Sequence, residues 1–550
     1  MNPVKTKRAE SGSAVLSPEE QARQTTVTQI RAQLHPETWR RVAPHVQRFT
    51  PEQLAVVVRG IQGENVIVKA TAGSGKSTLI EVLGHVLPRK AGSEGRMGAF
   101  AFSTEIARVL KDRLPRDLPA RSFHSFGRQI LTAFRGELVV NGFKRRNLVH
   151  AHLGALGEYS KATAKGLQLL SERMLVELAP NTPERVRELC ERLELDFPET
   201  LNLCAALQAV ADQGLAQFHD SATIDFYDML YLPMKLGLGR GMLDLALVDE
   251  AQDFNRLQHR LIRHVMAPGA QIIFVGDPHQ AIFRFTGADP DGMDAAGLHF
   301  GATTLHLSYT FRCPVSHVRL AEQFSPNIRT PPGAAEGEVW NLDEAELPGQ
   351  LQDGDLVLCR TNAPLMALAL TLIARGTQVE ILGQDVKKEI VRILNRAFPV
   401  PFSSAEITGR LERTYDVLLD ARYAGGEHGQ ALVRGCERDA DLLACCGALA
   451  ARVADPQQGK PVRVTEVIAL LEKLLSGKGG VRLATIHMAK GLEAERVALL
   501  RPADLDPDSG EARHNAEALA VAFVAYTRAK LVLMLVGQAV PSEEFEDEAA

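Results

Sequence analysis

The stretch that decides the fold is residues 65–77, which read NVIVKATAGSGKS. A short apolar run at 65–70 leads into a glycine-rich turn, and a helical pattern of apolar residues follows from Lys76 to Leu87. A buried strand that ends in such a turn, at the start of a helix, is the setting that a phosphate-binding loop requires. This pattern predicts an α/β unit with an anion site at the end of its first strand.

The turn has the residues that hold a nucleotide triphosphate. Its glycines let backbone N–H groups turn toward one anion, and the helix N-terminus adds the positive end of its dipole. We expect Lys76 to contact the β and γ phosphates of ATP and Ser77 to ligate Mg²⁺. The usual pattern begins with Gly, whereas Ala70 stands here. The residues expected to bind ATP from this segment are Thr71, Ala72, Gly73, Ser74, Gly75, Lys76, Ser77 and Thr78.

Further apolar runs repeat the strand pattern along the chain. They lie at 97–102, 245–248 and 271–275, and again at 355–359, 378–382, 481–486 and 531–536. Strands that alternate with helices predict parallel sheets covered on both faces, with active residues at the carboxyl ends of the strands. The stretches 129–221 and 386–480 have mainly helical periodicity. The fold class is therefore α/β, with two sheet domains that each carry a helical insertion.

Two adjacent carboxylates end the segment LALVDE at 245–250, directly after its apolar run at 245–248. In an enzyme with a phosphate loop, the first carboxylate holds Mg²⁺ and the second accepts a proton from attacking water. We assign these roles to Asp249 and Glu250. The alternative is a strand that ends in a solvated acidic turn, which the phosphate loop upstream disfavours.

Composition excludes a disordered or fibrous protein and leaves nucleic acid open as a partner. The 550 residues suffice for about three to four domains, with 45% hydrophobic and 23% charged residues. The net charge of -5 arises entirely from the five acids of the last ten residues. Residues 105–150 instead carry ten bases and four acids, and this excess predicts a phosphate-binding face, with a solvated helix face as the alternative.

The ends and the cysteines bear on location. Residues 1–28 lack the apolar core of a signal peptide, and we expect them to be a disordered extension. No apolar run reaches the length of a membrane span. The 7 cysteines include no C-x-x-C pair, which favours a reducing compartment over a disulfide framework or metal cluster. We expect a cytoplasmic protein that does not enter membranes.

Several longer segments occur in a specific order. They are FTPEQ at 49–53, SFHSF at 122–126, DEAQD at 249–253, VGDPHQAIF at 275–283, LSYTFRCP at 307–314, VRLATIHMAKGLE at 481–493 and FVAYTRA at 523–529. Together with the phosphate loop they make the chain resemble the UvrD, PcrA and Rep family of superfamily 1 DNA helicases. The resemblance extends over most of the chain and implies two RecA-like P-loop domains.

The resemblance also implies roles in the ATP site. Gln53 would contact the adenine base and Phe311 would stack on it, while Glu493 would face the ribose. Gln280 would sense the γ phosphate and the attacking water. Arg312 and Arg528 would act as arginine fingers that neutralise charge as the γ phosphate departs. The catalytic set is thus Lys76, Asp249, Glu250, Gln280, Arg312 and Arg528.

DNA contacts carried over from the family involve backbone-directed groups and stacking aromatics. The residues so implied are Ser103, Thr104, Phe123, His124, Phe285, Thr485 and His487. The chain departs from the family at two places, with Thr286 where Arg is usual and Ala494 where an aromatic is common. The second insertion is also short for the family, which bears on strand separation more than on ATP hydrolysis.

The expected domain bounds follow from these motifs. They are an N-terminal extension at 1–45, a first RecA-like domain (1A) at 46–128 and 222–304, a helical insertion (1B) at 129–221, a second RecA-like domain (2A) at 305–385 and 481–540, a reduced helical insertion (2B-like) at 386–480, and an acidic tail at 541–550.

The function expected from the resemblance is an ATP- and Mg²⁺-dependent DNA helicase, and the pathway stays open among DNA repair, DNA replication, recombination control and defence against foreign DNA. The helicase would translocate on single-stranded DNA, 3′ to 5′, and act at junctions with duplex as a monomer or transient dimer. The alternatives are a translocase that strips proteins without efficient unwinding, and a nucleotide-gated regulatory protein. An RNA-directed motor is disfavoured only because the resemblance is to DNA enzymes. No residue of the sequence indicates whether the 2′-hydroxyl of RNA would be recognised. Protein partners are unknown, with the termini as candidate recruiting segments.

Overall fold

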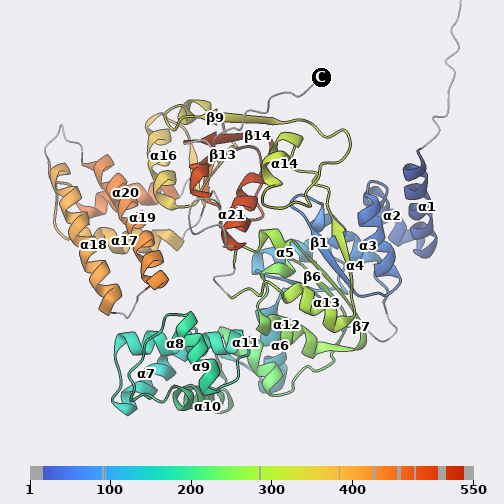
Figure 1. Cartoon of the computed structure of the whole chain (residues 1–550), viewed down its shortest axis with the longest axis horizontal. Coiled ribbons are helices and arrows are strands. Elements are labelled where there is room, and N and C mark those ends of the chain that lie inside the picture. Colours follow the sequence, from blue (N-terminus) through green and yellow to red (C-terminus); the bar gives the residue numbers. More distant parts are fainter. Residues whose placement is uncertain are drawn as a thin grey trace, which may run out of the picture.

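Two parallel six-stranded sheets form the centre of the molecule (Figure 1). The computed structural model describes residues 17–89, 92, 95–283, 287–382, 385–424, 429–454, 460–475, 479–505 and 516–537. The first sheet has the order β3 (Ala120–Ser122), β2 (Met97–Ala101), β6 (Leu243–Val248), β7 (Met266–Gly276), β1 (Val66–Ala70) and β8 (Thr303–Leu307). The second has the order β11 (Val379–Ile381), β12 (Val481–Thr485), β10 (Leu356–Cys359), β13 (Ala494–Leu500), β14 (Ala529–Val536) and β9 (Glu338–Leu342). The α/β class and the parallel sheets predicted from the sequence are confirmed.

Alternate residues of each first-sheet strand enter two different cores. On β1, Val66 and Val68 pack into one hydrophobic cluster and Ile67 packs into the other. This follows from the two-residue period of a strand, and an apolar run without polar alternation is what burial on both faces requires. The helices around this sheet are α3 (Pro51–Ile61), α4 (Lys76–Val86), α5 (Thr104–Arg113), α6 (Phe123–Arg135), α11 (Phe226–Lys235), α12 (Arg256–Val265) and α13 (Gly292–Phe300), with 3₁₀ turns η1 (Ala251–Asp253) and η2 (Pro278–Gln280).

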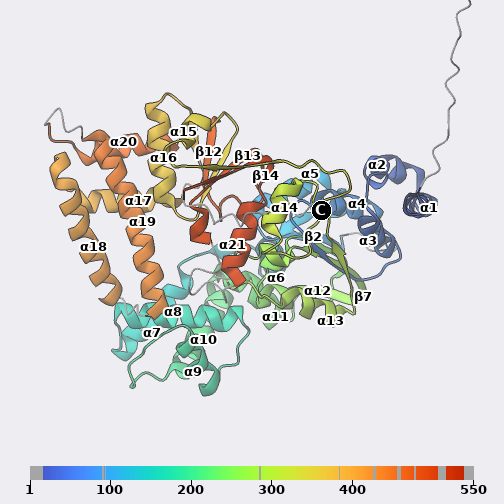
Figure 2. The ribbon, with the colours of Figure 1, turned by 45° about the horizontal axis from the view of Figure 1, so that its top comes forward.

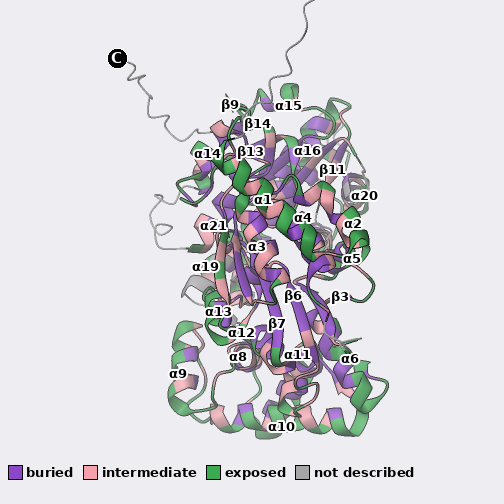
Figure 3. Ribbon diagram, turned by 90° about the vertical axis from the view of Figure 1, so that its right-hand side faces the viewer, coloured by how far each residue is buried: buried purple, intermediate pink, exposed green. Residues whose placement is uncertain are grey.

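The second sheet is also covered on both faces. Leu356 and Leu358 of β10 enter one cluster, whereas Val357 and Cys359 enter the other. The helices close to this sheet are α14 (Val315–Ala321), α15 (Leu347–Gln350), α16 (Asn362–Ala374) and α21 (Ala516–Tyr526), with a 3₁₀ turn η5 (Pro502–Leu505). Figure 3 shows the strands as buried ribbons between partly exposed helices.

Two helical groups lie on the same side of the molecule, away from the N-terminal helices (Figure 2). The first group is α7 (Lys144–Leu156), α8 (Lys161–Val176), α9 (Pro183–Arg192) and α10 (Leu203–Ser221), flanked by the short parallel pair β4 (Val139–Val140) and β5 (Thr223–Ile224). This group has a hydrophobic core of its own. The second group is α17 (Asp385–Ala397), α18 (Ile407–Ala424), α19 (Gly429–Val453) and α20 (Val464–Leu475), with η4 (Ser404–Glu406).

The two groups join their sheets differently. The predicted start of the first insertion, residue 129, falls inside α6. The core of the second group is continuous with one face of the second sheet, because Phe398, Leu449 and Leu471 belong to the same cluster as Val357 and Met534. Asp441 of α19 strengthens this junction, since its carboxylate accepts hydrogen bonds from the backbone N–H of Asn362 and Ala363 at the start of α16.

The N-terminal segment is more ordered than its composition predicts. Helix α1 (Pro18–Gln33) begins within the stretch 1–28 that we expected to be disordered, and α2 (Pro36–Val46) follows it. Ser17 caps α1 by accepting from Glu20 N–H, and Ile30 is buried against the first-sheet core. The expectation is therefore wrong for residues 18–28, where one buried apolar residue and good helix formers stabilise a helix. Residues 1–16 lie outside the described residues.

Candidate functional site

The predicted phosphate loop joins β1 to α4 in the geometry that its glycines allow. Gly73 has φ +69° and Gly75 has φ +79°, both in the left-handed region that favours glycine. Thr71 N–H donates to Leu307 O at 2.9 Å, which ties the loop to β8. Gly75 is the N-cap of α4 without a side-chain cap. The first N–H groups of α4 are therefore free to bind an anion.

Because Gly73 has no side chain, the phosphate loop can lie close to the segment that follows β8. A Cβ atom on Gly73 would lie 2.6 Å from both Arg312 Cβ and Thr310 Oγ1. Phe311 N–H donates to Gly73 O at 2.9 Å. This contact holds Phe311 and Arg312 beside the phosphate loop, as their predicted roles require. The ring of Phe311 is 53% exposed, so it has an open face on which a base can stack.

Gln53 supports the phosphate loop from within the protein. Its side chain is buried and donates from Nε2 to Ser74 O at 3.0 Å. Its Oε1 accepts from Thr50 N–H at 3.0 Å in the capping box of α3. Both ends of the amide are engaged inside the chain, so contact with adenine, as predicted, requires these bonds to be exchanged.

Asp249 and Glu250 stand at the carboxyl end of β6, as predicted, and differ in their electrostatics. Burial and the adjacent Glu250 charge raise the pKa of Asp249 to about 7, and Lys76 opposes the rise. For Glu250, burial acts to raise the pKa, but Lys76 and Lys490 outweigh it and hold the pKa below the ordinary value. Glu250 is therefore ionised at neutral pH and can accept a proton. It also has φ +51°, an unusual conformation for a residue with a side chain.

A hydrogen-bonded network connects Glu250 to Gln280. Gln252 donates from Nε2 to Glu250 Oε2 at 2.6 Å and accepts from Asp277 N–H at 2.9 Å. Gln280 donates to Asp277 Oδ2 at 2.5 Å. The amide groups of Gln252 and Gln280 thus connect the two carboxylate-bearing turns that follow β6 and β7. Gln252 and Asp277 were assigned no role from the sequence, although both lie in the family-like segments at 249–253 and 275–283.

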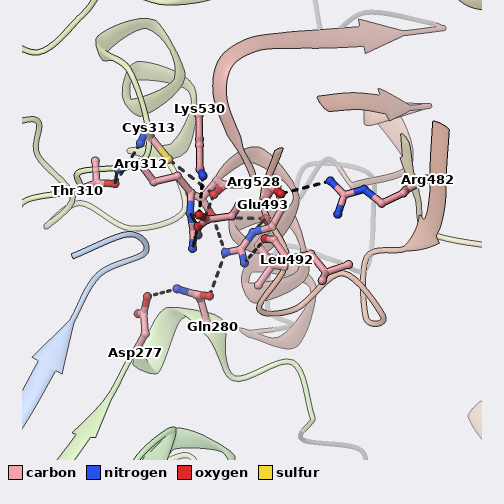
Figure 4. Close-up of polar contacts among 12 residues, drawn as sticks. Asp277, Gln280, Thr310, Arg312, Cys313, Arg482, Leu492, Glu493, Arg528 and Lys530 are labelled. Carbon is pink, nitrogen blue, oxygen red and sulfur yellow. Dashed lines mark hydrogen bonds and ion pairs between the residues drawn. The ribbon is translucent and has the colours of Figure 1, made fainter. Parts of the chain in front are cut away.

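Arg528 extends from the end of α21 to Gln280 (Figure 4). Its Nη2 donates to Gln280 Oε1 at 3.1 Å, and its Nε donates to Val524 O at 2.8 Å. The side chain is 1% exposed, and burial together with the nearby Arg312 charge lowers its pKa. An arginine keeps its charge under such a shift, so a buried cation of the second-sheet domain faces the first-sheet residue expected to orient the water.

Arg312 and Lys530 share one carboxylate, that of Glu493. Arg312 donates from Nε to Glu493 Oε2 at 2.7 Å and from Nη1 to Thr527 O at 3.2 Å. Lys530 Nζ lies 2.7 Å from Glu493 Oε1. Burial acts to raise the pKa of Glu493, but Lys530 and Arg312 lower it overall. Glu493 thereby positions one predicted finger, in addition to its predicted contact with ribose.

A cleft of about 680 Å³ lies between the two sheet domains. This volume falls within the range of roughly 300–1,000 Å³ typical of small-ligand sites. Gly73, Lys76 and Ser77 line it from the first side, and Glu493 and Arg528 line it from the second. The other predicted residues in its wall are Ser74, Gly75, Thr78, Glu250, Gln280, Phe311 and Arg312, whereas Gln53, Thr71, Ala72 and Asp249 do not line it. The wall also contains four residues to which the sequence assigned no role in the ATP site, Arg113, Lys490, Gly491 and Lys530.

The donor set fits a magnesium ion bound together with phosphates. Ser77 lines the cleft at the start of α4, and Asp249 is close enough to Lys76 for the ammonium to lower its pKa. A hydroxyl and a carboxylate are oxygen ligands of the kind that Mg²⁺ prefers, with water and phosphate oxygens filling the other positions. Ser77 and Asp249 are thus the residues that would hold the ion.

Of the predicted DNA residues in the first-sheet domain, Thr104 is exposed, Ser103 and His124 are half-buried, and Phe123 is buried. Ser103 caps α5, which begins at Thr104, and His124 lies at the start of α6 beside the exposed ring of Phe226. Phe123, in contrast, is 1% exposed and stacks on Phe100 at 4.8 Å, which argues against direct contact of its ring with DNA.

Two of the remaining predicted DNA residues belong to the second-sheet domain. Thr485 ends β12 and His487 follows it, each partly buried. Burial, Arg360 and Lys490 lower the pKa of His487, so its ring is neutral near pH 7. Phe285 and Thr286 lie outside the described residues.

The basic stretch 105–150 is not a uniform phosphate-binding face. Lys144 is 2% exposed, and its ammonium donates to Asp228, Gly214 O and Thr223 O at 2.7–2.9 Å. Arg145 pairs with Asp225 at 3.3 Å. Only Arg146 of this triplet is exposed, with its guanidinium 4.5 Å from the ring centre of Phe143. The prediction that Lys144 binds phosphate is wrong, because acceptors within the protein satisfy its ammonium.

Comparison with known proteins agrees with this arrangement. Residues 49–300 match the family model of the UvrD/REP helicase N-terminal domain. F-box DNA helicase protein 1 of Schizosaccharomyces pombe is 28% identical over 53% of this chain and 34% of its own length. DNA helicase II of Haemophilus influenzae is 24% identical over 60% of this chain and 52% of its own length. ATP-dependent DNA helicase Rep of Escherichia coli is 26% identical over 41% of this chain and 36% of its own length. The chain thus spans about a third to a half of the length of these relatives.

Among the described helices, none combines the length and apolar character needed to cross a lipid bilayer. The matched region, 49–300, contains the phosphate loop, Asp249, Glu250 and Gln280. With its two parallel sheets and the cleft between them, the chain is similar to UvrD/Rep-like helicases, and residues 49–300 match the UvrD/REP helicase N-terminal domain.

Proposed function

We propose that this protein is an ATP-driven DNA motor whose ATPase depends on single-stranded DNA. The observation that carries the proposal is the bond from Arg528 to Gln280, which joins the second-sheet domain to the predicted water-orienting residue of the first. A cation that faces the phosphate site from a separate domain makes hydrolysis depend on the relative position of the domains. The names of the relatives, which are DNA helicases, support DNA as the track.

In the hydrolysis step, each residue has a distinct task. Lys76 and the N–H groups at the start of α4 hold the phosphates. Bound Mg²⁺ would neutralise phosphate charge as the γ phosphate departs. Glu250, ionised at neutral pH, accepts the proton of a water that Gln280 orients, and Arg528 stabilises the departing phosphate.

Coupling to movement follows from the two-sided cleft. When ATP draws Arg312 and Arg528 toward its phosphates the cleft closes, and it opens again when phosphate leaves. If single-stranded DNA crosses both domains, each cycle moves one domain along the strand. We propose 3′ to 5′ movement and unwinding at the junction with duplex, on the resemblance to the family.

A translocase that displaces proteins without efficient unwinding is the second candidate. The observation that favours it is the union of α17–α20 with the second-sheet core, through Phe398, Leu449 and Leu471. A bundle packed into a sheet domain moves with that domain and does not present an independent surface to duplex. A nucleotide-gated regulator without turnover is disfavoured, because Lys76, Glu250 and Arg528 all line one cleft.

The deciding experiment uses duplexes with a 3′ or a 5′ single-stranded tail, with ATP and Mg²⁺. Strand release and displacement of an end-bound protein are measured separately. Release from the 3′-tailed duplex alone supports the helicase, and displacement without release supports the translocase. In a parallel ATPase assay, turnover that is equal with and without single-stranded DNA contradicts the motor. Lys76→Ala and Glu250→Gln serve as inactive controls.

A further inference from the structure

A second basic site lies on α12, outside the nucleotide cleft. A groove of about 730 Å³ runs between α12, the end of α11, the end of α8 and the start of α13. We call it the α12 groove and define it by its basic residues Lys235, Arg256, Arg260 and Arg263. Figures 1 and 3 both show α8, α11 and α12 side by side. None of these four residues belongs to the nucleotide cleft.

Three of the four cations have no carboxylate partner among the described residues. Arg256 pairs with Asp289 at 3.2 Å, and the Asp289 charge also acts on Arg263, but among the described residues no carboxylate lies within ion-pair distance of Lys235, Arg260 or Arg263. Arg260 and Arg263 are three residues apart on α12, so their like charges lie on one face of the helix. This arrangement costs free energy unless an anion is bound.

The acids of the groove do not cancel this charge. Glu177 is committed to Arg185 and Arg192 on α9, and Asp289 to Arg256. Asp291 is exposed at the start of α13. The groove therefore keeps a net positive character after its internal ion pairs are counted.

Buried polar atoms in the wall lack hydrogen-bond partners. Arg263 Nε is buried and has no hydrogen-bond partner, and both ring nitrogens of His259 are buried without partners. His259 is 3% exposed and lines the groove against Gly292, where an added Cβ would lie 2.4 Å from Nε2. An unpaired buried donor costs about 1–3 kcal/mol, so an acceptor brought by a ligand would remove a standing penalty.

We infer that the α12 groove binds the phosphodiester backbone of DNA, through Lys235, Arg260 and Arg263. The inference rests on the proposed function and adds a second DNA contact to the motor, distinct from the aromatic contacts of the predicted track. Clustered guanidinium and ammonium groups bind phosphate oxygens well, and phosphate contacts do not depend on the base sequence. The groove therefore suits the DNA backbone rather than the base edges. The groove would hold a strand in place while the cleft opens and closes, independently of sequence.

The test compares Lys235→Gln/Arg260→Gln, two exposed residues, with the wild-type chain. The matched control is Arg40→Gln/Arg41→Gln, which removes the same charge from exposed positions of α2. Binding of an oligo(dT) strand and of a blunt duplex is measured between 50 and 200 mM salt. We expect roughly five- to tenfold weaker binding for the groove variant, and a salt slope flatter by about 1.4 for the single strand, at about 0.7 per lost contact.

The outcomes separate this inference from the proposed function. If the wild-type chain binds no DNA, the proposed function fails. If it binds DNA and the groove variant matches the α2 control in affinity and slope on both probes, the α12 groove inference is overturned. Weaker binding to either probe by the groove variant alone supports it. Arg263→Gln is the second variant and is expected to act in the same direction, with thermal unfolding measured to exclude loss of fold.

Discussion

Lys490, which follows β12 of the second sheet, forms a buried ion pair with Asp253, the last residue of η1 beside the first sheet. The ammonium also donates to Gln280 O at 2.7 Å and lies 5.0 Å from the ring centre of Phe283. Asp253 is 2% exposed. One side chain therefore links both domains at the residue that contacts Arg528, so the domain contact and the catalytic network share Gln280.

Removing only one partner of the Lys490–Asp253 pair should destabilise the protein strongly, and the loss in the double variant should be smaller than the sum of the two single losses. We expect Lys490→Met to lower the free energy of unfolding by roughly 3 kcal/mol, because it leaves a buried carboxylate without its cation. The double variant Lys490→Met/Asp253→Asn should lose less than the sum of the single variants. Urea unfolding measures all three. Lys530→Met, which removes a partly exposed pair with Glu493, is the control and should cost at most about 1 kcal/mol. Additive losses would contradict the coupling.

Asp253 should make stability depend on pH. Burial raises its pKa to about 7, with Lys490 opposing the rise. The folded carboxyl then binds a proton below pH 7, whereas the unfolded one binds it only below about 4. Between these values the folded state holds more protons, so stability decreases as pH rises from about 4 to 7, by at most about 1.4 kcal/mol per unit, and then levels.

The measurement is the free energy of unfolding of wild type minus that of Asp253→Asn, followed from pH 4.5 to 8.5. The difference should decline up to about pH 7 and stay constant above it. A difference that does not vary over this interval would show that Asp253 titrates in its ordinary range.

Arg528→Ala should separate nucleotide binding from hydrolysis. We expect affinity for ATP to stay within about threefold of wild type while the DNA-stimulated rate falls by about 10³-fold or more, since the finger acts on charge that develops in the transition state. Arg528→Lys, which loses the planar fork that reaches Gln280, should recover little. Arg501→Ala, which removes an exposed pair with Glu344, is the control. An unchanged rate in Arg528→Ala would remove its finger role.

Substitution of Lys144 should destabilise the protein, whereas substitution of Arg146 should not. Lys144→Met leaves Asp228 buried without its cation and should cost roughly 3–5 kcal/mol of stability. Burial, with Asp225 nearby, already raises the pKa of Asp228, so this carboxyl depends on its cation. Arg146→Gln changes an exposed guanidinium and should leave thermal unfolding within about 0.5 kcal/mol. A stable Lys144→Met protein would show that the buried pair is dispensable.

The local elements were predictable because short-range rules govern them. The run at 65–70 and the helix from Lys76 were both expected, and β1 and α4 form there. The carboxylates after β6 followed from the same reasoning, since the end of a parallel strand is where a turn exposes polar groups. The α1 helix was missed because its apolar residues are few and its stability depends on burial of Ile30 against the first-sheet core.

The sequence by itself determined the fold class, the phosphate loop and the order of the segments that line one cleft, because strand and helix periods and glycine geometry act over a few residues. Only the tertiary structure decided which charges are paired: Lys144 with Asp228, Lys490 with Asp253, and Glu493 with both Arg312 and Lys530. These partners are far apart in the chain, and their ionisation depends on burial. Composition could therefore count the charges, but only the packing of the helices and sheets could show that Lys144 is buried and that Arg260 on α12 lacks a carboxylate partner among the described residues.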